Sequence, residues 1–240
     1  MTQKAIKTQI LADAESVAKE AAKVIVAVAR AAVAARRRFV MAVSGGHTPW
    51  QMLRALANED VPWESVHVFQ VDERIAPAGD SDRNLTHLRE SLLEHARLPA
   101  DQIYPMPVEE PNIEIAAESY ARTLQQIAGT PPILDLVHLG LGPDGHTASL
   151  VPNDPVLNVI DRDVAITGGY QGRKRMTLTY PVINRARRIL WVVTGNEKVK
   201  SLVQLENGDT SIPGGRIRRE QALVLADRAA AGGNVEKVVA

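Results

Sequence analysis

The sequence predicts an α/β fold with a mainly parallel central sheet and helices on both faces. Short apolar runs that end in glycine or polar residues alternate with segments of helical periodicity through most of the 240 residues. Parallel strands need crossover connections, and right-handed crossovers place helices on both faces of the sheet. No repeat, low-complexity tract or long linker divides the chain, so we predict a single domain over residues 1–240.

The first predicted element is a long amphipathic helix over residues 13–37. Val17 and Ala21 begin a series of apolar residues at steps of three and four, which lie on one helix face. Asp13 stands at the capping position, and Arg36 stands where the helix dipole favours positive charge. Further helices are expected at 48–57, 84–94, 112–128 and 197–206, and strands at 39–43, 66–71, 133–141, 164–167, 175–180, 189–194 and 222–225.

The charge balance and the absence of cysteine exclude several classes of protein. Lys and Arg together number 28, and Asp and Glu also number 28, so the net charge is zero and we expect no nucleic-acid or membrane partner. A chain without cysteine has no disulfide, no thiolate nucleophile and no cysteine-ligated metal. Residues 1–16 lack the apolar core of a signal peptide, and the apolar stretch 21–35 is interrupted by Lys23 and Arg30. We therefore expect a cytoplasmic protein.

Four predicted strand ends carry unusual glycine-rich or polar sequences. Ligands of open α/β sheets bind outside the carboxyl ends of the strands, where the loops of one edge converge. We therefore expect these four segments to line one pocket. They are 44–49 (SGGHTP), 72–77 (DERIAP), 140–149 (GLGPDGHTAS) and 194–198 (TGNEK).

The turn Ser44-Gly45-Gly46 joins a strand to a helix and is predicted to bind an anion. Glycines let backbone N–H groups approach an anion closely, and the dipole at the start of a helix adds a favourable potential. An ordinary tight turn is the simpler alternative. Ser44 as a hydrolase nucleophile is another, because the sequence from Ala42 to Gly46 nearly matches the G-x-S-x-G elbow. The first glycine of that elbow is missing, however, and this strand comes too early in the chain.

The segment from Gly140 to Gly145 matches the G-x-G-x-x-G pattern of dinucleotide-binding folds, but we reject that interpretation. The pattern needs a following helix, and Pro152 and Pro155 leave room only for a short turn. Asp144 would also place a negative charge beside the pyrophosphate. We therefore expect no dinucleotide and no other cofactor.

His146 is instead predicted to act as an acid/base group. An imidazole, with an unperturbed pKa of ~6.5, exchanges a proton near neutral pH, and Asp144 two residues away would orient it. His138 lies inside an apolar strand and is expected to be a core residue, whereas the role of His47 beside the glycine turn stays open. No spacing among the histidines matches a zinc site, so we expect no metal.

Three basic residues stand where they could bind an anion at the same edge of the sheet. Arg74 ends the DER segment, and its alternative is a surface ion pair with Asp72 or Glu73. Arg175 begins an alternating strand and is expected to point inward. Lys198 lies at the start of a helix, where its charge opposes the dipole, which indicates a bound anion.

In this order and spacing, the motifs resemble the 6-phosphogluconolactonase family over residues 40–230, with RMTLTYPVIN at 175–184 as a further match. The resemblance implies a modified Rossmann-like three-layer sandwich, shared with glucosamine-6-phosphate deaminases and ribose-5-phosphate isomerases. It also implies hydrolysis of 6-phospho-D-glucono-1,5-lactone to 6-phospho-D-gluconate in the pentose phosphate pathway, without metal or cofactor. The expected ligand is therefore a sugar phosphate, and the expected assembly is a monomer or a weak homodimer.

The same resemblance implies roles for single residues. His146 becomes the catalytic acid/base with Asp144 beside it, and Arg74 lies near the substrate. The implied substrate- and phosphate-binding residues are Ser44, Gly45, Gly46, Asp72, Arg175 and Lys198.

The chain departs from the family pattern at three positions. Val151 stands where the family often has Phe, Asn153 where it often has Gly, and Arg83 where it often has Ser. Related deaminases carry a glutamate at the position of Val151, so this chain lacks that carboxylate. A sugar-phosphate deaminase or isomerase on the same fold is the nearest alternative. A non-catalytic sugar-phosphate-sensing domain is another, but such regulators need a pair of DNA-reading helices, and residues before 40 predict one long helix.

Overall fold

The structure is a computed structural model that describes residues 5–233. In spatial order, the seven parallel strands of its central sheet are β1 (Lys7–Leu11), β10 (Ala222–Asp227), β9 (Ile189–Val193), β6 (Leu136–Leu139), β2 (Phe39–Val43), β3 (Val66–Gln70) and β5 (Ile103–Tyr104). A second sheet has three antiparallel strands, in the order β4 (Asp72–Arg74), β8 (Arg175–Leu178) and β7 (Val164–Ile166).

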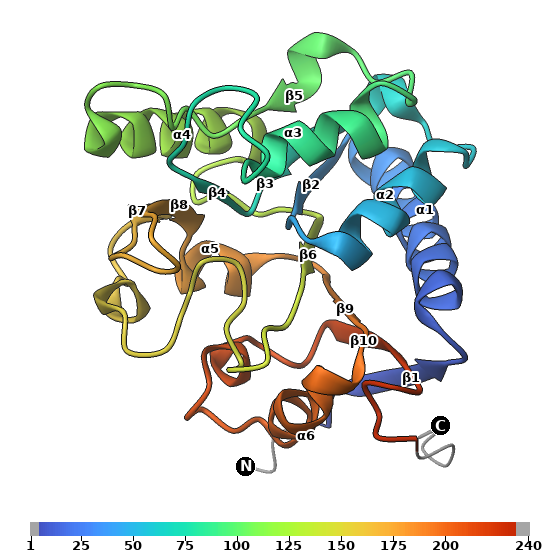
Figure 1. Ribbon diagram of the computed structural model, residues 1–240. Coiled ribbons are helices and arrows are strands. Elements are labelled where there is room, and N and C mark those ends of the chain that lie inside the picture. Colours follow the sequence, from blue (N-terminus) through green and yellow to red (C-terminus); the bar gives the residue numbers. More distant parts are fainter. Residues whose placement is uncertain (1–4, 234–240) are drawn as a thin grey trace.

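Helices lie on both sides of the parallel sheet (Figure 1), so the fold is the predicted α/β sandwich with a mainly parallel sheet. The α-helices are α1 (Ala14–Arg36), α2 (His47–Ala57), α3 (Asn84–Leu88), α4 (Ile113–Ala128), α5 (Tyr180–Arg185) and α6 (Val199–Asn207). A π-helical turn follows α3 at Arg89–Leu93, and 3₁₀ turns lie at Trp63–Ser65, Ala100–Gln102, Pro155–Asn158, Asn196–Lys198 and Pro213–Arg216.

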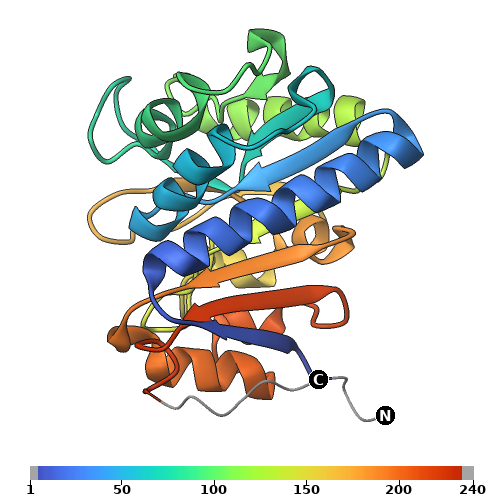
Figure 2. The ribbon, with the colours of Figure 1, turned by 90° about the vertical axis from the view of Figure 1, so that its right-hand side faces the viewer.

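The two faces of the parallel sheet bury their side chains in two separate cores. In β2, Phe39, Met41 and Val43 face one core, and Val40 and Ala42 face the other. Helices α1, α2 and α3 pack on the first face, and α4, α5, α6 and the antiparallel sheet pack on the second. Figure 2 shows α1 lying in front of the parallel sheet and running alongside its strands. A strand buried on both faces reads as a continuous apolar run, which is why β2 could be predicted.

Helix α1 confirms the prediction for residues 13–37 almost to the residue. The Asp13 carboxylate caps it by accepting a hydrogen bond from the N–H of Ser16 at 2.8 Å. Val17 and Ala21, at helical spacing, are fully buried. Arg37 ends the helix in the left-handed region, with a φ of 64°.

The strands expected at 164–167 and 175–180 lie outside the mainly parallel central sheet. These residues form β7 and β8 of the antiparallel sheet, where β4 pairs with β8 directly after the chain leaves β3. Residues 167–174 alone join β7 to β8. Parallel neighbours need a crossover of about a dozen residues or more, so this connection permits only an antiparallel pair.

Several predicted boundaries also need correction. The strand expected at 175–180 ends at Leu178, because Pro181 lies in the first turn of α5, a helix that was not predicted. The strand expected at 133–141 is limited to β6, and the helix expected at 84–94 continues from α3 as a π-helical turn. The short β5 and the edge strand β1 were not predicted either, since the side chains of β1 are half-buried or exposed and form no apolar run.

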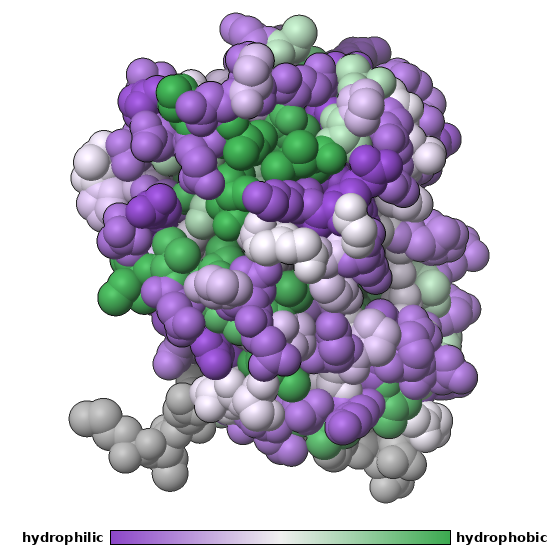
Figure 3. All heavy atoms as spheres, turned by 60° about the vertical axis from the view of Figure 1, so that its left-hand side comes forward, coloured by the Kyte–Doolittle hydropathy of each residue, from purple (hydrophilic) through white to green (hydrophobic). Residues whose placement is uncertain are grey.

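Among the described residues, no helix is both long and apolar enough to cross a membrane. The face that carries α4 and β7 is largely polar, with apolar patches between the polar side chains (Figure 3). Ile115 in α4 and Ile160 are among the exposed apolar residues. Scattered apolar side chains such as these are normal on a protein surface.

Candidate active site

A pocket of about 450 Å³ lies at the carboxyl ends of the parallel strands. All four segments that were expected to converge contribute to its wall. The predicted site residues that line it are Ser44, Gly45, Gly46, Asp72, Arg74, His146, Arg175 and Lys198. Asp144 is outside the lining and contacts His146.

The lining brings three cationic side chains together with two carboxyl groups. The cations are Arg74, Arg175 and Lys198, and the carboxyl groups belong to Asp72 and Glu197. A pocket with this excess of cations suits a ligand that carries negative charge at one end.

The glycine turn leads from β2 into α2, and buried His138 holds its first residue in place. The N–H of Ser44 donates to His138 Nδ1 at 3.3 Å, and Ser44 Oγ donates to the His138 carbonyl oxygen at 3.1 Å. Burial lowers the pKa of His138 to about 3, so this histidine is the neutral core residue that was predicted. Because the Ser44 hydroxyl donates to a carbonyl instead of an imidazole nitrogen, the geometry does not support a serine nucleophile.

Gly45 and Gly46 leave backbone N–H groups at the pocket. Within residues 5–233, no protein group accepts a hydrogen bond from either N–H. Gly46 has a φ of 121°, and a Cβ at Gly45 would lie 1.9 Å from Asn84 Oδ1, so both positions require glycine. The two N–H groups form the kind of backbone nest that binds anions.

The His146 ring is held by Asp144. His146 Nδ1 lies 2.6 Å from Asp144 Oδ1, which also accepts from the His146 N–H at 3.1 Å. Partial burial acts to raise the pKa of Asp144, but the hydrogen bonds and charge of His146 outweigh it and lower that pKa. An ionised carboxylate can only accept, so Nδ1 carries the proton and Nε2 is left as the acceptor.

The chain after Gly145 turns instead of forming a helix, which agrees with the rejection of a dinucleotide site. An isolated bridge joins Thr147 to Leu150. A Cβ at Gly142 would lie 2.1 Å from His146 Nδ1 and 2.6 Å from Asp144 Oδ1. Gly142 is therefore needed for the close approach of this histidine and carboxylate to the backbone.

The antiparallel sheet carries the two arginines of the pocket on adjacent strands, with Arg74 opposite Arg175. Arg74 Nη1 donates to Asn84 Oδ1, and no ion pair to Asp72 or Glu73 is formed within residues 5–233, so the alternative interpretation of Arg74 was wrong.

Arg175 points inward, as predicted. Its guanidinium lies 5.0 Å from the centre of the Tyr170 ring, and Nη2 donates to Gln171 Oε1 at 3.1 Å. The side chain is buried, yet Nε has no partner among the described residues. A buried guanidinium with an unused donor is costly, so the pocket favours a ligand that accepts from it.

Asp72 lies deep in the pocket wall. Its Oδ2 accepts from Ser149 Oγ at 2.6 Å, and its Oδ1 accepts from Asn84 Nδ2 at 3.3 Å. Burial raises the pKa of Asp72, against the opposing effects of the Ser149 hydrogen bond and the nearby Arg74 charge.

Lys198 ends a 3₁₀ turn that leads into α6. Its Nζ lies 3.6 Å from Glu197 Oε1, a contact that already offsets part of its charge. Across the pocket, the hydroxyl groups of Thr48 and Thr194 hydrogen-bond to one another and connect the glycine turn to the end of β9.

Sequence reasoning assigned no role to four residues of this site. Asn84 contacts both Asp72 and Arg74, and Tyr170 donates to Asp144 Oδ2 at 3.4 Å. Thr48 and Thr194 close the polar lining. Thr48 and Thr194 stand inside the motifs at 44–49 and 194–198, but nothing in the sequence signals the contacts of Tyr170.

Within residues 5–233, no group of three or more His, Cys, Asp or Glu side chains is placed to hold a metal ion. The His47 side chain lines the pocket but is exposed to solvent. The structure thus brings His146, the backbone N–H groups of Gly45 and Gly46 and three cationic side chains together in one pocket, with Asp144 behind His146.

Comparison with known proteins gives consistent results. The family model described as glucosamine-6-phosphate isomerases/6-phosphogluconolactonase matches residues 12–225. The chain is 40% identical over 178 residues to 6-phosphogluconolactonase of Synechocystis sp., an alignment that covers 72% of this chain and 74% of the relative. It is 34% identical over 237 residues to 6-phosphogluconolactonase of Mycobacterium tuberculosis, with 93% and 96% covered. The crystal structure of 6-phosphogluconolactonase from Thermotoga maritima matches with a TM-score of 0.82 at 27% identity, covering 92% of this chain and 98% of the other.

Proposed function

This chain belongs to the glucosamine-6-phosphate isomerase/6-phosphogluconolactonase family, and we propose that it hydrolyses 6-phospho-D-glucono-1,5-lactone to 6-phospho-D-gluconate. The observation that carries the proposal is the joining of two functions in one pocket. His146 with Asp144 can move a proton there, and Arg175 and Lys198 can hold a phosphate. The relatives that are named for this activity support the choice of substrate.

In the proposed mechanism, His146 acts first as a base. Its Nε2 takes a proton from a water molecule while the water oxygen attacks the C1 carbonyl carbon of the lactone. The tetrahedral intermediate then breaks the bond between C1 and the ring oxygen, and the imidazolium returns the proton to that oxygen. Such acid/base catalysis contributes ~10²–10⁴-fold. Because a lactone is an activated ester, the reaction needs no covalent nucleophile.

Asp144 sets the tautomer that this mechanism requires. Its carboxylate accepts from Nδ1 at 2.6 Å, so the lone pair is on Nε2. The same carboxylate stabilises the imidazolium that forms after proton transfer. The T-shaped contact of the Tyr170 ring with the imidazole, at 5.5 Å between centroids, restricts the ring further.

The other lining groups bind the two ends of the substrate. The N–H groups of Gly45 and Gly46, together with Arg175 and Lys198, hold the 6-phosphate, and each charge-assisted hydrogen bond contributes ~1.5–3 kcal/mol. Arg74 stabilises the oxyanion that develops at C1, since its guanidinium is held at the pocket by Asn84.

Asp72 belongs to the proposed substrate-binding set, and Ser44 supports the glycine turn through its bonds to His138. Binding of the phosphate far from the reacting carbon makes the attack effectively unimolecular.

The structure gives no specific support to the nearest alternative, a deaminase or isomerase. Related deaminases carry a glutamate at position 151, whereas Val151 is apolar and buried here. A sensing domain would need DNA-reading helices, and the described residues before 40 contain β1 and α1.

The test is a continuous assay of acid release with freshly generated 6-phosphogluconolactone. Spontaneous opening of the lactone is measured without protein and subtracted. We expect turnover of the lactone and no release of ammonia from glucosamine 6-phosphate. Ammonia release would support the deaminase instead. Binding of 6-phosphogluconate without any lactone hydrolysis would support the sensing domain.

A further inference from the structure

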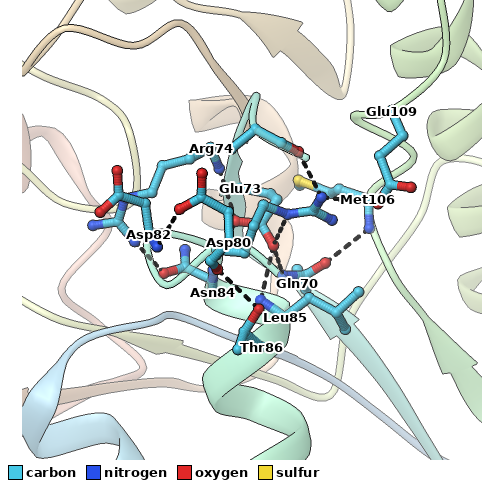
Figure 4. Close-up of polar contacts among 12 residues, drawn as sticks. Gln70, Glu73, Arg74, Asp80, Asp82, Asn84, Leu85, Thr86, Met106 and Glu109 are labelled. Atoms are coloured by element: carbon cyan, nitrogen blue, oxygen red, sulfur yellow. Dashed lines mark hydrogen bonds and ion pairs between the residues drawn. The ribbon is translucent and has the colours of Figure 1, made fainter. Parts of the chain in front are cut away.

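Glu73 is a fully buried carboxylate that lies behind the pocket and does not line it. Its Oε1 accepts hydrogen bonds from the N–H groups of Arg74 and Asn84, both at 2.8 Å. Its Oε2 accepts from the N–H of Leu85 at 2.8 Å and from Gln70 Nε2 at 2.9 Å (Figure 4). One side chain therefore joins the end of β4 to the first turn of α3.

Arg83, a departure from the family pattern, supplies the counter-charge for this carboxylate. The residue is 2% exposed, and its Nε lies 3.2 Å from Glu73 Oε2 as an ion pair without hydrogen-bond geometry. Its Nη1 donates to the Ala76 carbonyl oxygen at 2.8 Å and to Glu109 Oε1 at 2.9 Å. Arg83 thus connects buried Glu73 to the following loop and to an exposed carboxylate on a distant segment.

Two of the three residues that Glu73 holds by their backbone N–H groups, Arg74 and Asn84, also line the pocket. Arg74 Nη1 donates to Asn84 Oδ1, and Asn84 Nδ2 donates to the Asp72 carbonyl oxygen at 3.0 Å. The Asn84 side chain also packs against Gly45 so closely that a Cβ there would collide with it. A shift of either backbone segment would therefore move the guanidinium, the amide and the glycine turn together.

We infer that Glu73, balanced in charge by Arg83, is a positioning residue that sets Arg74 and Asn84 in the pocket. Both carboxylate oxygens of Glu73 accept hydrogen bonds from N–H donors. In Glu73→Gln, the amide NH₂ group would replace one of these oxygens and would face N–H donors to which it cannot bond. The inference rests on the proposed lactonase activity for its kinetic readout, and it concerns how the chain holds the reactive groups in place.

The main experiment compares Glu73→Gln with the matched control Glu109→Gln, which removes the exposed partner of the same arginine. We expect Glu73→Gln to lower kcat/KM at least about tenfold, since a small misplacement of a reactive group is costly. Glu109→Gln should stay within about twofold of the parent, as exposed ion pairs contribute little. Equal kcat/KM values for the two variants would overturn the inference.

A double-mutant cycle separates positioning from general damage to the fold. If Glu73 acts through Arg74, adding Glu73→Gln to Arg74→Ala should lower kcat/KM by less than about threefold further. If the loss of kcat/KM in the double variant equalled the product of the losses in the two single variants, Glu73 would not act through Arg74.

If Glu73→Gln does not fold, Arg83 provides the second test. Arg83→Lys keeps the positive charge beside Glu73, and Arg83→Met replaces it with an uncharged side chain of similar length. We expect kcat/KM of the Lys variant to exceed that of the Met variant at least about fivefold. Equal kcat/KM values would overturn the role of the buried charge.

A parent protein without lactonase activity would refute the proposed function and leave the positioning role open to a direct measurement. Amide hydrogen exchange at Arg74, Asn84 and Leu85 needs no substrate. We expect exchange at these three amides to be at least about tenfold faster in Arg83→Met than in Arg83→Lys. Equal exchange rates in the two variants would overturn the inference without any kinetic measurement.

Discussion

The two walls of the pocket are built in different ways. The parallel wall consists of residues 44–49, 140–147 and 194–198, which follow strands of the central sheet. It presents backbone N–H groups and His146 on tight, glycine-dependent turns. The antiparallel wall consists of β4, β8 and Asn84. It presents two guanidinium groups and a carboxyl group. Buried Asn84 contacts Arg74 and Asp72, and exposed Gln171 accepts a hydrogen bond from Arg175.

This difference teaches which kind of change each wall tolerates. In the parallel wall, a single added methyl group at Gly142 would displace the imidazole, because the backbone itself shapes the site. In the antiparallel wall, β4 and β8 are regularly paired strands, and the wall is distinguished by the charged side chains that it presents. We therefore expect the parallel wall to be sensitive to volume and the antiparallel wall to be sensitive to charge.

The largest effect should come from His146 in the parallel wall. Replacing His146 by Ala removes the proton acceptor, so we expect kcat to fall by ~10²–10⁴-fold. The Kd for 6-phosphogluconate should change little, because the phosphate is bound by other groups. Kinetics together with calorimetric titration of the product would check both values. Activity close to that of the parent would show that another group is the base.

A smaller but clear loss should follow from Gly142→Ala, which tests the sensitivity to volume. The new Cβ would lie 2.1 Å from His146 Nδ1. The ring and Asp144 must move, so we expect kcat to fall by ~10²-fold, the effect of a misplaced catalytic group. Gly169→Ala, on the loop between β7 and β8, is the control, since nothing lies within 4 Å of a Cβ there. Equal kcat values for the two variants would contradict the distinction between the walls.

The two walls also differ in how far the sequence predicted them. The glycine turn and His146 stood out because each forms a local motif at a strand end, and the inward direction of Arg175 followed from strand alternation. Glu73 and Arg83 could not be identified in this way. Charged residues are almost never fully buried, so no sequence pattern signals a buried pair whose contacts depend on the packing of β4 against α3.

The same reason explains why the second, antiparallel sheet was not predicted. Alternation identified the strand residues near 164–167 and 175–180 but not the strands with which they pair. The single domain, the roles of the site residues, the cytoplasmic location and the weak or absent self-association stay predictions.

Arg175→Ala should show the sensitivity of the antiparallel wall to charge. Loss of charge-assisted bonds to the phosphate, at ~1.5–3 kcal/mol each, should raise KM for the phosphorylated lactone by ~10–100-fold. The kcat should change much less. Arg173→Ala is a matched control because Arg173 pairs with Asp80 and Asp82 outside the pocket. A similar KM in both variants would mean that Arg175 does not bind the phosphate.

The smallest effect concerns His138 under the parallel wall and appears in stability. The pKa of His138 is about 3 in the fold and that of an unfolded histidine is ~6.5, so below pH ~6.5 the unfolded chain takes up a proton that the native chain does not. The free energy of unfolding should therefore fall by at most ~1.4 kcal/mol per pH unit as the pH drops from ~6.5 to ~5.

His138→Asn is the comparison for this effect, because Asn does not titrate and offers an acceptor near the place of Nδ1. Urea unfolding at several pH values should show a weaker pH dependence in the variant than in the parent. The same dependence in both proteins would mean that His138 does not take part in the loss of stability.

Substrate discrimination tests most directly whether both walls act on one sugar phosphate. The measurement is kcat/KM of the parent protein for 6-phosphogluconolactone and for unphosphorylated gluconolactone under the same conditions. Three or more charge-assisted bonds to the phosphate should favour the phosphorylated lactone by at least about a thousandfold. Equal kcat/KM values for the two lactones would contradict a phosphate site in this pocket.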